Sequence, residues 1–250
     1  MGKVIRVDEI SPGEISLIFH KLNYSTLNYF IPLFVQEAME SNGELYVAYS
    51  KDKTPESLFV YDPVEKSGTC FTNDRNTALK FYHLKPDSEF FTSFPCISSC
   101  TYETLFSIDI GMVRNDLVLK QQIQIFDEMK RGDLIRFMLN AYGKVNINWV
   151  NSALQHGEKC FICIKESKIV GMGWLGIFEG IGRLHSLYVQ ENYRNMRIGE
   201  SLVTARIQWA RFVRLRKVVS EIPEKSTYSR EIAIKFGFAD VGKIYRWFHP

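Results

Sequence analysis

The chain has 250 residues, of which 46% are hydrophobic and 24% charged, and this composition excludes wholesale disorder. No run of about 18 apolar residues predicts a membrane span, and a formal net charge of +3 is too small to indicate a nucleic-acid binder. The five cysteines show no disulfide framework and the first residues lack a signal-peptide core, so we expect a cytoplasmic protein without a membrane partner.

Two stretches of the first half resemble two stretches of the second half, in the same order. Residues 5–19 match residues 123–137 in a strand, an Asp-Glu pair, a Gly and a helix. Residues 35–49 match residues 150–164 in a helix, a Gly and a strand. This repetition at a similar offset indicates an internal duplication, although any two strand–helix units share features of this kind.

The duplication predicts two domains, an N-terminal α/β domain at 1–119 and a second domain at 120–250. From Gln121 onward, the periodicity predicts the element order β-α-α-β-β-β-α-β-α-β. Asp133 is expected to cap the first of these helices and Gly143 to end it. The cysteines of "CFIC" lie on a predicted strand, where residues three apart point to opposite faces, so we expect no metal site.

The stretch "HSLYVQENYRNMRIGESL" joins a predicted strand to an amphipathic helix through a loop that contains Arg194, Arg197 and Gly199. The first turn of such a helix presents unpaired N–H groups and the positive end of the helix dipole. A loop folded as a nest adds further N–H donors, and together they suit a pyrophosphate. The alternative is a strand–helix corner with solvated arginines. In the helix that follows, apolar residues are expected on one side and the arginines largely on the other.

The residues "LYVQENYRNMRIGESLV" resemble the acetyl-coenzyme A loop of the GNAT superfamily of N-acetyltransferases. In that family the strand ends Val-x-Pro-x-x-Arg and the loop runs Arg/Gln-x-x-Gly-x-Gly/Ala, which Val189, Arg194 and Gly199 fit. The element order and the closing "AIKFGFADVG" fit as well. The resemblance implies an α/β (α+β) GNAT fold, with a mixed, mostly antiparallel central sheet flanked by helices. The suspected repeat implies a tandem arrangement whose first copy is degenerate.

The same resemblance implies an N-acetyltransferase with acetyl-CoA as co-substrate and direct attack by a primary amine in a ternary complex. In the family, main-chain N–H groups of the strand before the loop bind the pantetheine arm and polarise the thioester carbonyl. By position these belong to Leu187, Tyr188 and Val189. The other coenzyme-binding residues that the resemblance implies are Arg194, Asn195, Met196, Arg197, Ile198, Gly199, Glu200 and Ser226.

His185 is the candidate general base. The strand "RLHSLYVQ" resembles the corresponding strand of the arylalkylamine N-acetyltransferases, whose histidine at this position serves as base, directly or through water. An unperturbed imidazole titrates near pH ~6.5, which suits the removal of a proton from an amine. The alternative is an inert, hydrogen-bonded histidine on a sheet face. Glu221 and Glu179 are reserve bases.

Two departures from the family pattern leave other functions open. Arg197 replaces a usual Gly, and a positive φ there costs about 1 kcal/mol. Ala233 replaces a frequent Tyr that protonates the departing thiolate, which leaves Tyr228 as a candidate acid. The alternatives are a weak or inactive coenzyme-binding regulatory module and a nucleic-acid-binding protein that uses the basic helix 199–216. The sequence does not identify the acceptor, a small amine or a peptide amine, or the oligomeric state.

Overall fold

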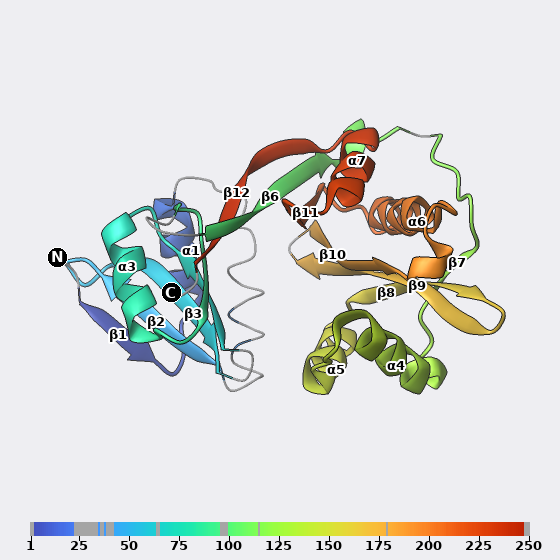
Figure 1. Cartoon of the computed structure of the whole chain (residues 1–250). Coiled ribbons are helices and arrows are strands. Elements are labelled where there is room, and N and C mark those ends of the chain that lie inside the picture. The colour runs from blue at the N-terminus through green and yellow to red at the C-terminus, as the bar shows by residue number, and fades with distance from the viewer. Residues whose placement is uncertain are drawn as a thin grey trace. The chain divides into compact units, whose positions relative to one another are not determined.

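The computed structural model (Figure 1) describes residues 3–22, 35, 38, 43–63, 66–95, 100–114, 116–178 and 180–247. The chain divides into two compact units. The first consists of Met1–Leu105, Ile222–Lys225 and Val241–Pro250, and the second of Phe106–Glu221 and Ser226–Asp240. This division lies ahead of the predicted boundary at 119/120, which stays a prediction. Among the described residues, no helix has the length and apolar character needed to cross a membrane.

The first unit has a sheet in the order β1-β2-β3-β4-β5-β12. Neighbouring strands are antiparallel except β4 and β5, which are parallel. The elements of this half of the chain are β1 (Val4–Val7), α1 (Pro12–Lys21), β2 (Glu44–Tyr49), β3 (Pro55–Asp62), β4 (Ser67–Phe71), α3 (Arg75–Leu84), β5 (Glu89–Thr92) and β6 (Cys100–Asp109).

Alternating side chains of β3 supply the two cores of this first unit. Leu58 packs in one apolar cluster with Ile18 of α1. Phe59, the next residue, points to the other face and stacks on Phe81 of α3 with ring centroids 5.5 Å apart. Since successive strand residues face opposite sides, one apolar strand buries both helices.

The second unit has a sheet in the order β6-β11-β10-β9-β8-β7. The predicted order of elements from Gln121 is confirmed, with two short 3₁₀ turns in addition. From Ile110 to the end of the chain, the elements are η2 (Ile110–Met112), β7 (Ile123–Ile125), η3 (Glu128–Lys130), α4 (Arg131–Tyr142), α5 (Ile147–Gln155), β8 (Lys159–Lys165), β9 (Lys168–Phe178), β10 (Ile181–Val189), η4 (Glu191–Tyr193), α6 (Ile198–Phe212), β11 (Lys217–Pro223) and α7 (Thr227–Lys235), followed by β12 (Ala239–Trp247), which belongs to the sheet of the first unit.

Of the two boundaries predicted for the first helix of this unit, the start is wrong and the end is confirmed. The first helix of this unit begins at Arg131 with Lys130 as N-cap, so the prediction that Asp133 caps it is wrong. The 3₁₀ turn η3 precedes the helix, and the side chain of Asp127 accepts the N–H of Met129 there. Gly143 ends the helix as predicted, with a left-handed φ of 73°.

Helix α6 covers one face of the second sheet, and α4 and α5 cover the other (Figure 1). Strand β9 shows why α6 approaches so closely. A Cβ atom on Gly171 would lie 2.8 Å from Cγ2 of Ile198, and one on Gly173 would lie 2.8 Å from Cζ of Arg206. The next residue in each case, Met172 or Trp174, packs on the opposite face with α4 and α5. The glycines therefore bring α6 down onto the sheet at the loop that precedes it.

The two units repeat one arrangement, as the internal match of the sequence indicates. In each, an antiparallel run of strands (β1 to β4, or β7 to β10) leads through a helix (α3 or α6) to a parallel neighbour, β5 or β11. The last strand of each sheet comes from the other half of the chain. Strand β12 pairs with β5, with Tyr245 opposite Thr92, and β6 lies beside β11.

Candidate coenzyme and catalytic site

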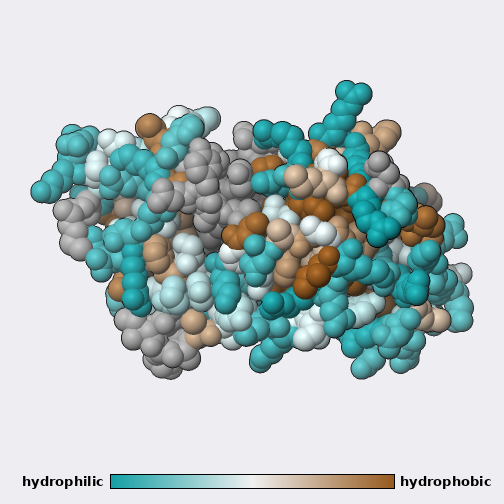
Figure 2. All heavy atoms as spheres, turned by 90° about the horizontal axis from the view of Figure 1, so that it is seen from above, coloured by the Kyte–Doolittle hydropathy of each residue, from teal (hydrophilic) through white to brown (hydrophobic). Residues whose placement is uncertain are grey.

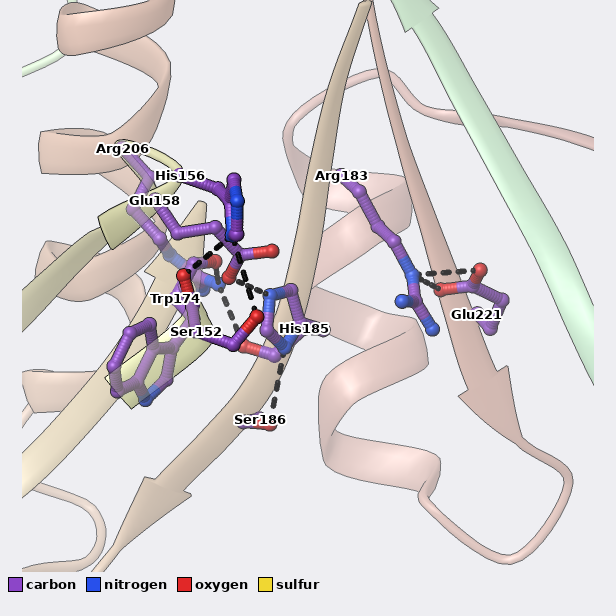
Figure 3. A network of polar contacts seen from close by, with 9 residues as sticks. All are labelled: Ser152, His156, Glu158, Trp174, Arg183, His185, Ser186, Arg206 and Glu221. Carbon is purple, nitrogen blue, oxygen red and sulfur yellow. Dashed lines mark hydrogen bonds and ion pairs between the residues drawn. The ribbon is translucent and has the colours of Figure 1, made fainter. Parts of the chain in front are cut away.

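Strands β10 and β11 separate after a short parallel pairing. They pair only from Ile181, opposite Lys217, to Arg183, opposite Val219, and Figure 3 shows them diverging beyond that point. Strand β10 continues to Val189 against β9. Gln190 donates its N–H to the carbonyl of Val170 at 2.9 Å. By the alternation of antiparallel strands, the N–H of Val189 points away from β9 into the gap.

A β-bulge interrupts β10 beside this gap. The register shifts between His185 and Tyr188, and Ser186 has a left-handed φ of 51°. Leu187 lies half-buried within the bulge. By the same alternation, the N–H of Tyr188 faces β9, so Val189 fits the predicted main-chain donor role better than Tyr188. Bulges are common beside active sites because they redirect side chains and leave backbone groups unpaired.

Arg206 of α6 supports this bulge from the face of the sheet that α6 covers. It donates from Nη1 to the carbonyls of Trp174 (3.1 Å) and His185 (3.4 Å) and from Nε to Leu202 (3.1 Å). Its side chain is 1% exposed, so the expectation that the helix arginines lie on the polar side is wrong for this residue. Burial lowers the pKa of the guanidinium to about 10. Arg206 therefore positions the sheet and does not face an external anion.

The loop between β10 and α6 forms a nest of backbone N–H donors. Asn195 and Arg197 have left-handed φ values of 64° and 59°, on either side of Met196. The first backbone bond of α6 runs from the N–H of Ser201 to the carbonyl of Arg197, at 3.1 Å, and Arg197 provides no side-chain cap. The N–H groups of the first turn therefore have no acceptor within the helix. Such a terminus suits an anion.

The matching helix of the first unit has a different start. The carboxylate of Asp74 accepts the N–H of Asn76 at 3.2 Å and of Thr77 at 2.9 Å, which caps α3. The pKa of this carboxyl is lowered, first by the hydrogen bond from the Thr77 hydroxyl. A carboxylate therefore already occupies the position where an anion would bind. This agrees with the expectation that the first copy of the suspected repeat is degenerate.

The predicted coenzyme-binding side chains occupy several different environments. Nε of Arg194 donates to the carbonyl of Val189 at 3.3 Å, and this arginine also faces Glu191 at 3.8 Å. Glu200 forms an ion pair with Lys235 at 2.7 Å. Arg194 and Glu200 thus fix the ends of the loop, while Met196 is half exposed and Ile198 is buried in contact with Gly171.

Helix α7 lies against the first turn of α6. A Cβ atom on Gly199 would contact Ile232 at 3.4 Å and the Tyr228 ring at 3.5 Å. Tyr228 is 46% exposed beside the loop. Ser226 is the N-cap of α7 by position, and its side chain makes no capping hydrogen bond. Gly237 follows the helix with a left-handed φ of 86°.

A basic pocket borders the same helix start, with a volume of about 310 Å³. The segment before β7 closes one side of it, since the N–H groups of Lys120 and Gln121 donate to Oγ of Ser201 at 3.1 and 3.0 Å. Its charged lining residues are four cations and two anions: Arg114, Lys120, Arg197, Lys235, Asp116 and Glu200. The excess of positive charge favours a phosphate-bearing ligand.

His185 lies on the α4/α5 side of the sheet, in a polar network that Figure 3 shows. Its Nε2 is 3.0 Å from Oε2 of Glu158, and its Nδ1 is 3.1 Å from Oγ of Ser186. Trp174 stacks on the imidazole with ring centroids 6.3 Å apart, and Trp149 meets it edge-on at 5.8 Å. The imidazole side chain is only 12% exposed.

Glu158 is a buried carboxylate at the start of β8, with a side chain that is 6% exposed. Burial alone raises the pKa of this carboxyl, but the hydrogen bond and charge of His185 outweigh burial, so the pKa is lowered. Arg183 and His156 add smaller contributions in the same direction. Glu158 is therefore ionised at neutral pH, and its oxygens can only accept hydrogen bonds.

The reserve bases lie apart from this network. Glu221 binds Arg183 on the other side of β10, with Nε 3.1 and 3.2 Å from its two carboxylate oxygens (Figure 3). Glu179 lies outside the described residues. Within the described part of the chain, no group of three or more His, Cys, Asp or Glu side chains gathers to hold a metal ion.

The sequence reasoning missed Glu158, Ser186 and Arg206. Charged residues are rarely buried, so a glutamate after "HG" and an arginine among other arginines carry no local signal of burial. Ser186 adjoins His185 in sequence, but a strand pattern places successive residues on opposite faces. Only the bulge brings the Ser186 hydroxyl back to the imidazole.

Comparison with known proteins agrees with this geometry. Residues 125–238 match the model of the acetyltransferase (GNAT) family, while a search of curated proteins gives no match. A Drosophila protein aligns over 100% of this chain and 99% of its own, with TM-score 0.68 and 9% identity. A GNAT-family acetyltransferase from Colwellia psychrerythraea aligns over 98% of both chains, with TM-score 0.66 and 10% identity. A tandem GNAT protein from the clavulanic acid biosynthesis pathway covers 99% of this chain and 98% of its own, with TM-score 0.64 and 9% identity.

The sheet, the separated parallel strands and the uncapped helix together define an acetyltransferase fold. More particularly, residues 125–238 are a GNAT-family domain, and the chain as a whole has the fold of the tandem GNAT proteins. The predicted fold class, a mostly antiparallel mixed sheet flanked by helices, is confirmed.

Proposed function

We propose that the protein is an N-acetyltransferase that binds acetyl-CoA in its second unit and transfers the acetyl group to a primary amine. When bound, acetyl-CoA supplies an activated acyl group as a thioester. The observation that carries the proposal is the open start of α6, where left-handed Asn195 and Arg197 precede a first turn that no side chain caps. Such a cradle of N–H groups fits a pyrophosphate.

The remaining parts of the coenzyme fit the same region. The N–H of Val189 points into the gap between β10 and β11, where it can donate to a pantetheine amide or a thioester carbonyl. Arg197 and Lys235, which line the basic pocket, supply charge for phosphate groups. Ser226 offers a hydroxyl that does not cap its own helix.

His185 is the proposed general base. It comes from the strand that borders the gap, and a neutral imidazole can take the proton of an attacking amine near neutral pH. Attack by the neutral amine then forms the C–N bond directly, without an acyl-enzyme. Glu221 is a weaker candidate because Arg183 binds both of its oxygens.

Protonation of the departing thiolate falls to Tyr228 or to water, because Ala233 offers no acidic group. Tyr228 lies beside Gly199 at the start of α6 and is exposed. A thiol with a pKa near ~8.5 is also a fair leaving group without an acid. The absence of a tyrosine at position 233 favours, as a second candidate, a coenzyme-binding regulatory module with little or no turnover.

Binding and turnover of acetyl-CoA test the proposal. Saturating acetyl-CoA is expected to raise the melting temperature and to shift the amide NMR signals of residues 194–200. Thiol release over a panel of amines separates the enzyme from the regulatory module.

Two substitutions test the proposed roles of the loop and of His185. Gly199→Glu is expected to abolish binding, because the new side chain enters the contact with Tyr228 and brings negative charge to the helix start. His185→Ala is expected to lower turnover 10²-fold or more, as loss of a general base does, with coenzyme affinity kept. Unmoved amide signals and an unchanged melting temperature would refute the proposal.

Nucleic-acid binding through helix 199–216 has weaker support. Arg206 is buried beneath the sheet, and the surface of the molecule seen from above mixes brown hydrophobic patches with hydrophilic side chains (Figure 2). Phe212, at the end of α6, is 76% exposed. Binding of that kind weakens steeply with salt, whereas coenzyme binding in a nest of backbone amides is expected to depend on salt only modestly.

A further inference from the structure

We propose that Glu158, His185 and Ser186 form a proton relay in which the Ser186 hydroxyl, and not the imidazole itself, faces the acceptor amine. Glu158 is then a positioning residue for His185. The inference rests on the proposed function, because it specifies how His185 receives the amine proton. It follows from the distances and burial of these three side chains.

The carboxylate of Glu158 fixes the tautomer of His185. An ionised carboxylate only accepts hydrogen bonds, so the 3.0 Å contact between Oε2 of Glu158 and Nε2 of His185 requires a proton on Nε2. In a neutral imidazole, Nδ1 is then the acceptor. The group facing Nδ1 is the Ser186 hydroxyl at 3.1 Å, which therefore donates to it.

The imidazole itself has little access to a ligand. Its side chain is 12% exposed, it packs against both Trp174 and Trp149, and both ring nitrogens already have partners. Ser186, the partner of Nδ1, is itself partly exposed. Its left-handed backbone turns the hydroxyl toward Nδ1 where a regular strand would point it away. Arg206 stabilises this bulge by donating to the carbonyl of His185.

A tyrosine lies beside the relay. The hydroxyl of Tyr142, at the end of α4, interacts with the Ser186 hydroxyl, and 44% of this tyrosine is exposed. Burial raises the pKa of this phenol to about 12, although the interaction with Ser186 acts in the opposite direction. The phenol is therefore neutral at neutral pH and does not compete with His185 as a base.

The proposed step balances as follows. As the lone pair of the neutral amine attacks the thioester carbonyl and the C–N bond forms, the amine nitrogen gives one proton to Oγ of Ser186 while the Ser186 hydroxyl proton passes to Nδ1 of His185. The resulting imidazolium is stabilised by the Glu158 carboxylate, as in the acid–base–hydroxyl arrangement of serine hydrolases. The C–S bond then breaks and the thiolate leaves, which completes the neutral amide. The proton then returns to solvent through the same hydroxyl. Ser186 itself is never acylated.

Other ionisable groups also act on this network. Arg183 and His156 lower the pKa of Glu158, and Cys160, at the start of β8, interacts with both Glu158 and Arg206. Burial raises the pKa of the Cys160 thiol, so that it stays neutral. Arg183 and His156 therefore help to keep Glu158 ionised within the relay.

The tautomer of His185 is the first test, and it needs neither substrate nor turnover. In full-length wild-type protein labelled with ¹⁵N-histidine, His185 is expected as the Nε2–H tautomer at neutral pH, assigned by loss of its signals in His185→Gln. The control is Asp109→Asn, which removes a carboxylate that pairs with Lys217 at 3.8 Å. It should leave the His185 signals unchanged. A protonated Nδ1 with a bare Nε2 in the wild-type protein would overturn the inference even if the enzyme is active.

Kinetics provide the second test. Ser186→Gly removes the hydroxyl and suits the left-handed φ, so it separates loss of the relay from backbone strain. It is expected to lower kcat about 10²-fold, within the range of acid–base catalysis, without changing KM for acetyl-CoA. If Ser186 and His185 act in one relay, either substitution alone removes the whole contribution of the relay. The double variant Ser186→Gly/His185→Ala should therefore be no slower than the slower single variant. Independent, multiplying losses would contradict the relay.

Glu158→Gln tests the positioning role. Its kcat should fall about 10-fold or more, and the acidic limb of the pH–rate profile should move to lower pH, because a neutral amide no longer stabilises the imidazolium. A purely structural role would lower stability and leave the pH–rate profile in place.

Mass spectrometry of acid-quenched enzyme should show no acetyl group on Ser186, and detection of an acetyl group there would assign Ser186 as a nucleophile instead. Failure of thiol release by the wild-type enzyme would refute the proposed function alone, because the tautomer measurement stands apart from it.

Discussion

Arg197 is the residue at which the family pattern and this chain differ most directly. The resemblance places a glycine there, and the structure gives Arg197 a left-handed φ of 59°. A side chain in this conformation costs about 1–2 kcal/mol, while its guanidinium lines the basic pocket beside α6. The effects of backbone strain and of side-chain charge at Arg197 can be separated by comparison with Asn195, which also has a left-handed φ (64°) but carries no charge.

Arg197→Gly is expected to raise the free energy of unfolding by about 1 kcal/mol and to weaken acetyl-CoA binding several-fold. Asn195→Gly should give a smaller gain in stability, because asparagine adopts the left-handed conformation more readily than arginine, and should leave the affinity unchanged because the backbone N–H is kept. Urea unfolding and isothermal titration calorimetry measure the two quantities. Equal affinities in the two variants would show that the Arg197 side chain does not bind phosphate.

The buried Glu158 gives the stability of the protein a specific pH dependence. Its pKa is lowered in the folded state from an ordinary value of 4.5. The carboxylate therefore stabilises the fold above about pH 4.5, and this contribution is lost as the pH falls further. Glu158→Gln should cost about 2 kcal/mol at pH 7, as hydrogen bonds to charged groups do, and less below pH 4.5. Urea unfolding of both proteins across this range measures the difference, and a constant difference would contradict the assignment.

At the scale of elements, the starts of α3 and α6 show how one repeated arrangement acquired two roles. Helix α3 is capped by the Asp74 carboxylate, whereas α6 has no side-chain cap. The sequence indicated the Arg and Gly of the loop before α6, while the cap by Asp74 is seen in the structure. What the sequence did not provide was the bulge in β10 or the separation of β10 from β11, since both depend on pairing with neighbouring strands.

Asp74→Ala is expected to destabilise the first unit by about 1 kcal/mol without changing acetyl-CoA affinity. Two N–H groups of α3 lose their acceptor, and the coenzyme loop lies in the other unit. Asp74→Ser, which keeps a capping oxygen, is the matched control and should recover most of the loss. Unfolding curves and calorimetry provide the readouts. Acetyl-CoA binding that responds to Asp74 would place a coenzyme site in the first unit.

At the scale of the whole molecule, the C-terminal strand stabilises the N-terminal unit. Trp247 is 1% exposed in the core that contains Phe59 and Phe90, and its indole N–H donates to the carbonyl of Phe94 at 2.8 Å. A fragment that starts at residue 120 therefore keeps a strand whose partner β5 is missing. It also loses β6, the neighbour of β11.

Trp247→Ala is expected to destabilise the first unit by about 3–5 kcal/mol, as truncation of a buried tryptophan does. Hydrogen exchange should increase in β3 and β5 and stay nearly unchanged in β8 and β9. Trp174→Ala, which truncates the fully buried tryptophan of the second unit, should give the opposite pattern. Equal loss of protection in both units after Trp247→Ala would show that they unfold as one cooperative body.

The sequence by itself determined the order of elements from Gln121, the internal repeat and the Arg- and Gly-containing loop before α6, because each is encoded in local periodicity or a short motif. It also singled out His185. Only the tertiary structure decided that β12 joins the first unit, that Arg206 is buried, and that Glu158 lies 3.0 Å from His185. These features join residues distant in sequence, through strand pairing and burial that no local pattern records. The partner of His185, and with it the proposed route of the proton, therefore became visible only in the folded chain.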